Sequence, residues 1–470
     1  MKHEEVFGKA VAQKIALLAL SPLDGRYAKT GEKLNEYFSE YALIKHRLTV
    51  EIAWLNFILT TVDNIPTVGV NDVTTEALSK ISQIVDDFDL DEAAKVKDIE
   101  KVTNHDVKAV EYYIDNKLVE LGLEKYVSLV HIGCTSEDIN STSYAMMLIE
   151  SLLEVWIPTA ENFITQLQEI AYEYCDLPML ARTHGQKATP TTVGKEFAVF
   201  AHRLEETLNI VKGIQVKGKF SGATGNYSAI STAFPDENWP LLCNYFVREW
   251  LEIGYNELTT QIEPHDYMCH LFDAIRHFNN IVLDLDLDMW SYISIDYFKQ
   301  IPVKTEVGSS VMPHKVNPIR FENSEANIDL SNAILLALSN KLSRSRWQRD
   351  LSDSSSQRNI GMAFGYSLLS IEQTAAGLRK ATVNVEEISD DLMDSWEVLA
   401  EPVQTMLRKY GIPDAYEKLK ELTRGKKITK EIMEEFIDSL DTLSKRDKDI
   451  LLALTPSNYI GLASDLVNIL

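Results

Sequence analysis

The stretch Gly308–Pro318, GSSVMPHKVNP, is the part of this sequence richest in side chains that could do chemistry. A pair of serines beginning with Ser309 offers hydroxyls, and Lys315 offers a positive charge. Pro318 fits the first position of a helix with Asn317 as its N-cap. The free N–H groups of a helix start favour negative charge, so they and Lys315 predict an anion site. An ordinary connection between two helices is the alternative.

A second polar segment, ARTHGQKATP over 181–190, contains His184. Histidine is the side chain whose ordinary pKa, about 6.5, best suits proton transfer at neutral pH. The glycine that follows, Gly185, would let a ligand approach the backbone closely. The alternative is a capping or surface histidine in a turn, and this segment alone does not distinguish the two.

Two further segments place polar residues where helices are expected to begin. VTNHDVKAVEYY contains Asn104, His105 and Asp106 in succession. HIGCTSEDINS contains Thr135 and Ser136 ahead of two acidic residues. Asparagine, aspartate, serine and threonine are also the usual N-caps of helices. Each segment therefore fits either a ligand site or a plain helix start.

The segment SRSRWQRDLSDSSSQRN concentrates positive charge in a chain with 46 basic and 70 acidic residues, a net charge of −24. Its arginines could bind phosphate or carboxylate through paired N–H donors; they are Arg344, Arg346, Arg349 and Arg358. Surface ion pairs with Asp350 and Asp353 are the alternative. The acidity of the whole chain disfavours nucleic acid and anionic membranes as partners.

Metal and cofactor motifs are not predicted. The segment DLDLD lacks the glycine and the distal glutamate of a calcium loop, and HDYMCH has no matching half-site for zinc. The sequence has no P-loop, no dinucleotide-binding glycine motif and no H-E-x-x-H. The four cysteines form no C-x-x-C pair, so we expect reduced cytosolic thiols.

Long helices are the elements expected to position these residues. Apolar residues recur at steps of three and four over 34–59, 149–174 and 271–289, with Pro158 a break or kink in the second. A further helix is predicted over 318–342, buried nearly all round in its second half. Helix breakers cluster between these runs, one cluster covering 177–190.

This pattern predicts an all-α protein with a central bundle of long helices and smaller helical ends. We expect three domains: an N-terminal helical domain over 1–124, a central bundle over 125–378 and a C-terminal helical domain over 379–470.

Several of these segments together resemble one known family. GSSVMPHKVNP resembles the signature loop of the fumarase/aspartase superfamily of lyases. Within that superfamily the chain resembles the adenylosuccinate lyase family from about residue 21 to its C-terminus. The resemblance is carried in order by SPLDGRY, TNHDVKAVEY, CTSEDIN, RTHGQKATPTTVGKE, TTQIEPHDY, MPHKVNPIRFEN, SRWQRDLSDS and WEVLAEPVQT. The histidine after Met-Pro, THGQ and IEPHDY select this family within the superfamily.

The resemblance implies an activity and an assembly. The reaction would be anti β-elimination of fumarate from adenylosuccinate to give AMP, and from the succinylated aminoimidazole carboxamide ribotide of purine biosynthesis. The protein would be a cytoplasmic homotetramer of three-domain subunits with shared active sites. It would bind a small nucleotide substrate without a metal or organic cofactor.

By the same resemblance, Ser309 is the base that removes a proton beside the succinyl carboxylate, and His184 is the acid that protonates the departing nitrogen. Lys315 and the helix start after it would stabilise the developing negative charge. Glu322 resembles the acidic partner that orients the acid histidine, and His105 is placed among the catalytic residues.

The remaining implied contacts are with substrate. Those on the nucleotide side, chiefly to phosphate, are Arg26, Tyr27, Arg349, Ser354 and Arg358. Those around the succinyl and leaving groups are Asn104, His105, Asp106, Thr135, Ser136, Gln261, Lys315, Asn317 and Asn323.

The chain departs from the family pattern in places without losing a proposed catalytic group. Lys187 stands where proline is usual, Arg320 where an acidic residue is common, and SSSQRN replaces a more apolar spacing before Arg358. Two rival functions stay open: another lyase of the superfamily, such as argininosuccinate lyase or fumarase, and a non-catalytic helical scaffold with the same fold.

Overall fold

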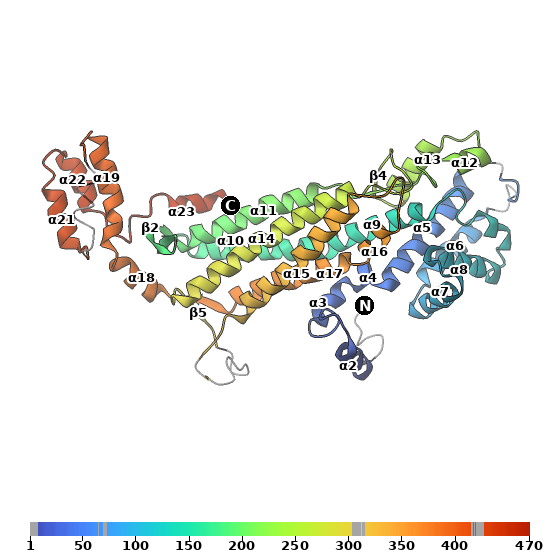
Figure 1. The fold of residues 1–470 in the computed structure, drawn as a ribbon, viewed down its shortest axis with the longest axis horizontal. Helices are drawn as coiled ribbons and strands as arrows, with labels where there is room; N and C mark the ends of the chain where they lie inside the picture. Colours follow the sequence, from blue (N-terminus) through green and yellow to red (C-terminus); the bar gives the residue numbers. More distant parts are fainter. Residues whose placement is uncertain are drawn as a thin grey trace. The chain divides into compact units, whose positions relative to one another are not determined.

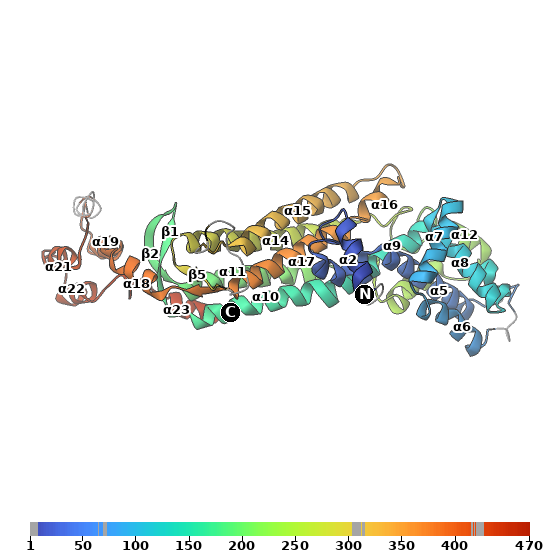
Figure 2. The same cartoon turned by 90° about the horizontal axis from the view of Figure 1, so that it is seen from below.

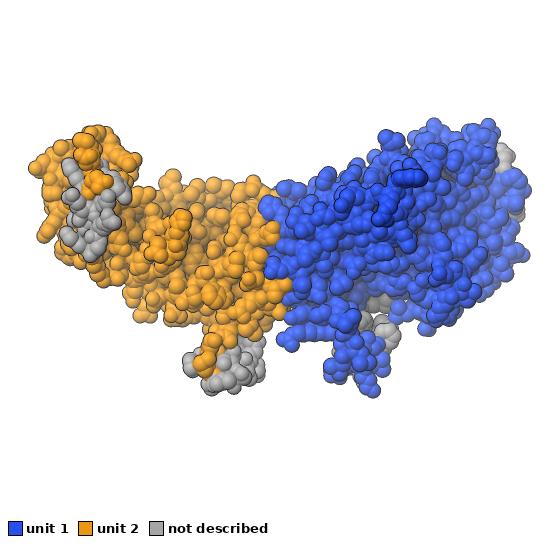
Figure 3. Space-filling view, viewed as in Figure 1, with its two compact units in different colours: residues 1–159, 207–279, 327–370 blue, residues 160–206, 280–326, 371–470 orange. Residues whose placement is uncertain are grey.

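The computed structural model describes residues 8–63, 65–68, 73–302, 312, 315–414, 417, 419 and 427–470. The chain divides into two compact units, shown in Figure 3. Unit 1 comprises Met1–Thr159, Thr207–Asn279 and Asn327–Ser370, and unit 2 comprises Ala160–Glu206, Asn280–Ala326 and Ile371–Leu470. Helices dominate the described part of both units (Figures 1 and 2), which confirms the predicted all-α class. The predicted three-domain division is a different partition and stays a prediction.

Unit 1 contains the N-terminal helices, and its elements are mostly helical. They are α2 (Lys9–Leu18), α3 (Ala28–Gly31), η1 (Glu32–Leu34), α4 (Asn35–Phe38), α5 (Glu40–Thr61), α6 (Thr75–Asp86), α7 (Leu90–Thr103), α8 (Asp106–Glu120), η2 (Glu124–Leu129), α9 (Ser136–Ser151), η3 (Leu152–Trp156), β3 (Lys217–Gly218), α12 (Ser228–Ala233), α13 (Trp239–Tyr245), η4 (Phe246–Trp250), β4 (Gly254–Tyr255) and α16 (Ser352–Gln357).

Helix α5 is the buried centre of the N-terminal part of unit 1. Its Trp54 is 2% exposed, and the Trp54 ring centroid lies 4.6 Å from that of Phe220 and 5.0 Å from that of Phe246. The indole N–H of Trp54 donates to the carbonyl of Ile132 at 3.0 Å. These contacts fix the segment that leads into α9, where two predicted site residues lie.

The prediction of one helix over 34–59 is wrong in one respect, because the chain breaks at Ser39. That residue is extended, with φ −74° and ψ 165°, and its hydroxyl accepts the N–H of Ala42 at 3.1 Å. Serine favours this N-cap geometry, so α4 ends and α5 begins there. A stripe of apolar residues does not reveal a single capping residue within it.

Helices α11 (Val193–Gly213), α14 (Asp266–Ser294), α15 (Ile319–Leu342) and α17 (Ile360–Leu378) each contribute residues to both units. In unit 1, buried hydrogen bonds join α14 to α15 and to α17. Asn279 of α14 donates to Ser331 of α15 at 3.1 Å and accepts from Ser367 of α17 at 2.7 Å. In unit 2, Thr374 of α17 donates to Asp286 of α14 at 2.7 Å. Such satisfied polar contacts specify how the helices of a bundle pair.

The predicted helix over 149–174 has the irregularity expected at Pro158. Helix α9 passes into the single π-turn η3, and α10 (Ile157–Glu173) begins directly before the proline. Proline lacks an N–H group, so a wider turn before it avoids a missing α-helical bond. The run 271–289 lies inside α14, as predicted.

Helix α15 is not buried nearly all round over its second half, contrary to the expectation. Leu335 is 0% exposed, whereas Leu336 beside it is 42% exposed within the single chain. The helix therefore buries one face in the subunit and leaves apolar side chains on another.

Unit 2 also contains the two-stranded antiparallel sheets β1 (Pro178–Thr183) with β2 (Gln186–Thr192), and β5 (Phe298–Gln300) with β6 (Ala381–Val383). The breaker cluster over 177–190 is thus a β-hairpin and not an irregular connection. The remaining described elements are α18 (Val385–Met393), η5 (Trp396–Leu399), α19 (Ala400–Lys409), α21 (Lys430–Asp438), α22 (Lys445–Leu452), α23 (Ala463–Leu466) and η6 (Val467–Ile469).

The C-terminal helices of unit 2 have a hydrophobic cluster of their own. Its most buried members include Leu407 at 0%, Ile428 at 1% and Met433 at 1% exposed. Among the described residues, no helix is long and apolar enough to cross a lipid bilayer.

Candidate active site

Three predicted site residues surround the start of α8 in unit 1. Asn104 ends α7 in the left-handed conformation, with a φ of 53°. His105 is the N-cap of α8, and its Nδ1 accepts the backbone N–H of Lys108 at 3.1 Å. The capping role thus belongs to His105 and not to Asn104 or Asp106. With Nδ1 assigned as the acceptor, the neutral ring carries its proton on Nε2, so the exposed side chain presents a donor.

Asp106, the first residue of α8, bridges two arginines. Its Oδ2 lies 2.8 Å from a guanidinium nitrogen of Arg47 and 2.8 Å from one of Arg358. Burial acts to raise the pKa of this carboxyl, but the two guanidinium groups outweigh it and hold the pKa below its ordinary value of 3.8. Asp106 is therefore ionised at neutral pH, and its charge brings Arg47 and Arg358 together.

Thr135 and Ser136 begin α9, where a helix start was expected. The Thr135 side chain accepts the backbone N–H of Asp138, and Asp138 Oδ2 accepts the N–H of Thr135 at 2.8 Å, which is a capping box. Asp138 Oδ1 also lies 2.7 Å from Lys219 Nζ, with both side chains 0% exposed. The same oxygen accepts the N–H of Ser221 at 2.8 Å. The start of α9 is thus anchored to the segment around Lys219.

Arg349 contacts two other predicted site residues. Its guanidinium donates to Gln261 Oε1 at 3.4 Å and to Ser354 Oγ at 3.2 Å. It also lies 2.8 Å from Glu137 Oε1, a carboxylate only 1% exposed. A buried charge needs a partner, so Arg349 and Glu137 stabilise each other's positions.

The arginine-rich segment therefore contains both of the predicted kinds of arginine: some in surface contacts and others close to residues of the candidate site. Arg346 is 84% exposed and pairs with Asp350 at 3.7 Å, as expected of a solvated surface. Arg344 Nε donates to the carbonyl of Asn340 at 2.9 Å. In contrast, Arg349 and Arg358 point into the polar contacts of α8 and α9.

These contacts form one continuous array of hydrogen bonds and ion pairs. Arg47 Nε donates to Asn140 Oδ1 at 2.9 Å, and Asn140 donates to Glu137 Oε1 at 2.7 Å. We call the six connected residues the polar chain; in order they are Arg358, Asp106, Arg47, Asn140, Glu137 and Arg349. The polar chain brings together α5, the starts of α8 and α9, and the segment 349–358.

Arg26 and Tyr27 lie in the loop before α3. The Arg26 guanidinium carbon is 5.9 Å from the centroid of the Tyr27 ring. Residues of the same loop, among them Ser21 and Asp24, line a cavity of about 250 Å³ together with Arg358. The structure thus places this loop and Arg358 around one cavity, although neither Arg26 nor Tyr27 lines it.

His184 lies at the tip of the β1–β2 hairpin in unit 2. Thr183 pairs with Gln186, which leaves His184 and Gly185 as the two loop residues. Their φ values are 53° and 73°, and positive φ at both positions is the requirement of a type I′ turn. Glycine adopts this conformation without strain, and the turn exposes the His184 ring to solvent.

The other predicted residues of unit 2 surround the start of α15. The helix begins at Ile319, and the N–H of Glu322 bonds to the carbonyl of Pro318 at 3.4 Å. Pro318 is therefore the N-cap, one position later than the predicted Asn317. Lys315 is exposed just before this helix start, where free N–H groups favour an anion.

Glu322 lies in the first turn of α15, and Asn323, which follows it, is half-buried. Trp290 Nε1 donates to Glu322 Oε1 at 3.3 Å. The predicted orientation of His184 by Glu322 stays a prediction. Ser309, the expected base, lies outside the described residues.

Two of the departures from the family pattern have structural partners. Lys187 Nζ lies 2.5 Å from Asp391 Oδ1 and donates to Ser395 Oγ at 2.9 Å. Arg320 donates to Gln373 Oε1 at 3.1 Å. The substituted side chains therefore make contacts of their own within unit 2.

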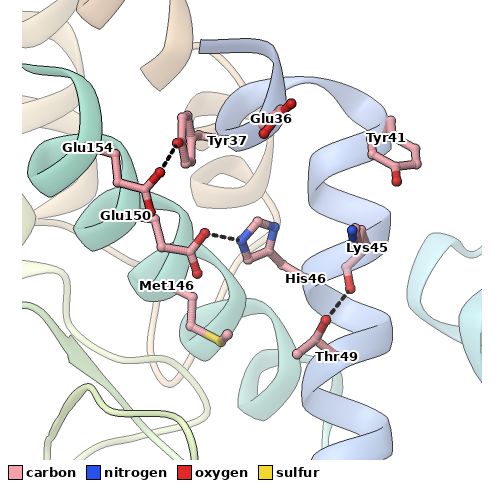
Figure 4. Close-up of a pocket in the computed structure, with 9 residues that line it drawn as sticks. All are labelled: Glu36, Tyr37, Tyr41, Lys45, His46, Thr49, Met146, Glu150 and Glu154. Carbon is pink, nitrogen blue, oxygen red and sulfur yellow. Dashed lines mark hydrogen bonds and ion pairs between the residues drawn. The ribbon is translucent and has the colours of Figure 1, made fainter. Parts of the chain in front are cut away.

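A larger cavity of unit 1, about 490 Å³, is separate from every predicted site residue (Figure 4). Its lining residues are Glu36, Tyr37, Tyr41, Lys45, His46, Thr49, Met146, Glu150 and Glu154. His46 Nε2 lies 3.1 Å from Glu150, and the Tyr37 hydroxyl donates to Glu154 at 2.7 Å. Three carboxylates disfavour an anionic ligand, so this cavity does not match the predicted chemistry.

Sequence reasoning missed Arg47, Asn140 and the role of Glu137. Arg47 lies on α5, most of whose side chains are buried, and is itself only 3% exposed. The only sequence feature that could have identified Arg47 is its charge within a segment of mostly apolar residues. Its partners lie in distant segments of the sequence. Within the described ranges, no group of three or more His, Cys, Asp or Glu side chains is arranged to hold a metal ion.

Comparison with known proteins defines the class. A family model described as "Lyase" matches residues 25–329. Among solved structures, a fumarate lyase from Mesorhizobium sp. BNC1 superposes with a TM-score of 0.74 at 16% identity, covering 93% of this chain and 97% of that one. A 3-carboxy-cis,cis-muconate lactonizing enzyme from Pseudomonas putida superposes with a TM-score of 0.72 at 17% identity, covering 93% and 95%. The fold is shared with these enzymes, and the chain is a lyase.

Closer relatives define the family. A model of the adenylosuccinate lyase C-terminal region matches residues 345–460. The adenylosuccinate lyase of Escherichia coli K12 is 46% identical over 96% of this chain and 98% of its own length. That of Haemophilus influenzae is 47% identical over 97% and 99%. The chain belongs to the adenylosuccinate lyase family.

Proposed function

We propose that this protein cleaves adenylosuccinate into AMP and fumarate. It also cleaves the succinylated aminoimidazole carboxamide ribotide of purine biosynthesis. The observation that carries the proposal is the similarity to adenylosuccinate lyases over nearly the whole length of both chains. The polar chain supports it, because Arg349 and Arg358 are cationic groups suited to an anionic nucleotide.

In this proposal Ser309 removes the proton from the carbon beside the succinyl carboxylate. The carbon–nitrogen bond then breaks, the electron pair of the C–H bond forms the double bond of fumarate, and His184 protonates the departing nitrogen. The exposed position of His184 at a hairpin tip supports a role at a surface shared with substrate. Lys315 and the start of α15 stabilise the negative charge on the succinyl group.

The other predicted residues bind substrate. Arg26, Tyr27, Arg349, Ser354 and Arg358 contact the nucleotide, and His105 with its neighbours contacts the succinyl region. The contacts among Arg349, Ser354 and Gln261 support their acting in one site. Glu322 orients His184 across a subunit boundary.

The active form is a cytoplasmic homotetramer with shared sites. Long helices with exposed apolar side chains support the assembly, among them Leu330 at 49% and Leu336 at 42% on α15. Four free cysteines, Cys134, Cys175, Cys243 and Cys269, support a reducing compartment. The three-domain division is supported by the separate hydrophobic cluster of the C-terminal helices.

An assay of fumarate release tests the function. We expect purified protein to release fumarate from adenylosuccinate and from the ribotide, with kcat in the ordinary range of about 1–1000 per second. Argininosuccinate and malate serve as control substrates and should give no turnover. Preference for either control substrate, or no fumarate from adenylosuccinate at high enzyme concentration, would overturn the proposal.

A further inference from the structure

The hairpin that carries His184 needs support from outside itself. Its base is buried, with Met179 at 1% and Leu180 at 0% exposed, but residues 182–187 at its tip are exposed. A two-stranded hairpin alone is marginally stable in water. A proton donor must be held to within about 0.5 Å of its productive position. Some other part of unit 2 must therefore fix the tip.

One carboxylate contacts both strands of the hairpin just before the tip. Arg182 and Lys187 are cross-strand partners, one pair removed from the turn. Asp391 Oδ2 accepts from Arg182 at 2.7 Å, and Asp391 Oδ1 lies 2.5 Å from Lys187 Nζ. Because the two oxygens of Asp391 receive one cation from each strand, the carboxylate fixes both sides of the turn at once.

Asp391 is itself held in place. The buried Tyr297, 1% exposed, donates its hydroxyl to Asp391 Oδ2 at 2.6 Å. Tyr297 leads into strand β5, and its carbonyl accepts the N–H of Asn384 at 2.8 Å. The Arg182 guanidinium also lies 5.8 Å from the centre of the Tyr297 ring. Helix α18 therefore fixes the backbone of Asp391, and Tyr297 beside β5 fixes its carboxylate.

The charge of Asp391 persists at neutral pH. Its side chain is 17% exposed, and burial acts to raise its pKa, but Lys187, Tyr297 and Arg182 outweigh burial and lower the pKa below its ordinary value. Charge-assisted hydrogen bonds of this kind are shorter and stronger than neutral ones. We call Asp391, Arg182, Lys187 and Tyr297 the Asp391 clasp.

We propose that Asp391 is a positioning residue for the lyase reaction, because the Asp391 clasp fixes the hairpin tip on which His184 is presented. The inference rests on the proposed function only for its catalytic part. Asp391 has no contact with reacting atoms in this proposal and acts solely through the position of His184. Its loss lowers the rate of proton donation without removing a group that binds substrate.

The test compares Asp391→Asn with Asp390→Asn, a matched loss of charge at the exposed neighbouring residue of the same helix. We expect Asp391→Asn to lower kcat about 10- to 100-fold with KM changed less than about threefold, because a displacement of about 1 Å costs rates of this order. Asp390→Asn should match the wild type. Asp391→Glu, which keeps the charge, should restore part of kcat.

Two further measurements separate positioning from general damage. In a His184→Ala background, adding Asp391→Asn should leave kcat unchanged, because the clasp then has no acid to position. Hydrogen exchange of the amides of 182–187 should be faster in Asp391→Asn than in Asp390→Asn, whether or not the enzyme turns over adenylosuccinate.

Either of two results would overturn the inference. One is a hairpin whose exchange is the same in both variants. The other is a further loss of kcat when Asp391→Asn is added to His184→Ala. A wild-type protein inactive on every substrate would instead overturn the proposed function, and the exchange measurement would still decide whether Asp391 fixes the hairpin.

Discussion

Asp106 illustrates how the position and the ionisation of a single residue in unit 1 depend on its partners. Its carboxylate is held by Arg47 and Arg358, each at 2.8 Å, while His105 beside it caps the same helix. A carboxyl whose pKa is lower in the folded chain than in the unfolded chain adds stability above its unfolded pKa. This stability is lost as the pH falls through the folded value. Asp106 belongs to this class.

We therefore predict a pH-dependent effect of Asp106→Asn on stability. Near pH 7 the variant should melt below the wild type, because Arg47 and Arg358 lose their shared charge. The difference in Tm should begin to shrink below about pH 4, where this carboxyl in the unfolded chain binds a proton, and should go on shrinking as the pH falls toward the lower pKa of the folded carboxyl. Thermal unfolding between pH 7 and pH 3 measures this, with the exposed Asp91→Asn as control. A difference that stays constant over the whole range would contradict the assignment.

At the residue scale, some of the residues that the sequence grouped into one predicted site are in contact, but the sequence did not reveal which residues connect them. Gln261, Ser354 and Arg349 were expected in one site, and the structure places them in direct contact. Arg47 and Asn140, which connect the two halves of the polar chain, were not foreseen. Burial of a charged helical residue depends on partners remote in sequence, and periodicity carries no information about them.

At the scale of elements, the start of α9 depends on a buried ion pair. Asp138 and Lys219 are both 0% exposed and lie 2.7 Å apart. The Lys219 ammonium also donates to the carbonyl of Gly222 at 2.8 Å. Removing one partner from such a pair leaves an uncompensated buried charge, which costs far more than the loss of a surface pair.

Lys219→Met should accordingly lower the free energy of unfolding by about 3–5 kcal/mol. Chemical denaturation measures this, and Lys101→Met, which removes an exposed pair with Asp98, should cost less than about 1 kcal/mol. The double variant Asp138→Asn with Lys219→Met should recover part of the loss, because the buried charge is then absent. A single-variant cost as small as that of Lys101→Met would be inconsistent with a buried pair.

The elements that were predicted correctly are those with long apolar periods. Helix α14 contains the whole predicted run 271–289, and α15 begins one residue after the predicted start. The β1–β2 hairpin was missed because its turn residues, His184 and Gly185, are not the usual Asn-Gly pair. The break at Ser39 was missed because one capping residue leaves the apolar period intact.

For the molecule as a whole, the proposed homotetramer has one decisive consequence. If Ser309 and His184 of one site come from different subunits, two strongly impaired variants can complement each other. Ser309→Ala and His184→Ala proteins, each with only a small residual kcat alone, should give about a quarter of wild-type activity when mixed into random tetramers. Activity is measured as fumarate release after dissociation and reassembly, with hybrid tetramers verified by mass. Verified hybrids without activity would show that each site lies within one subunit.

The arginines of the polar chain are already paired with carboxylates in this acidic protein, whose net charge is −24, and this affects how an anionic ligand can bind to them. Arg349 already has Glu137, and Arg358 already has Glu40 and Asp106. A phosphate or carboxylate that binds to either arginine therefore displaces or shares a resident carboxylate and does not meet a bare cation. Binding is then an exchange of counter-ions, and selectivity follows from how well a ligand's anionic groups reproduce the spacing of the carboxylates they replace.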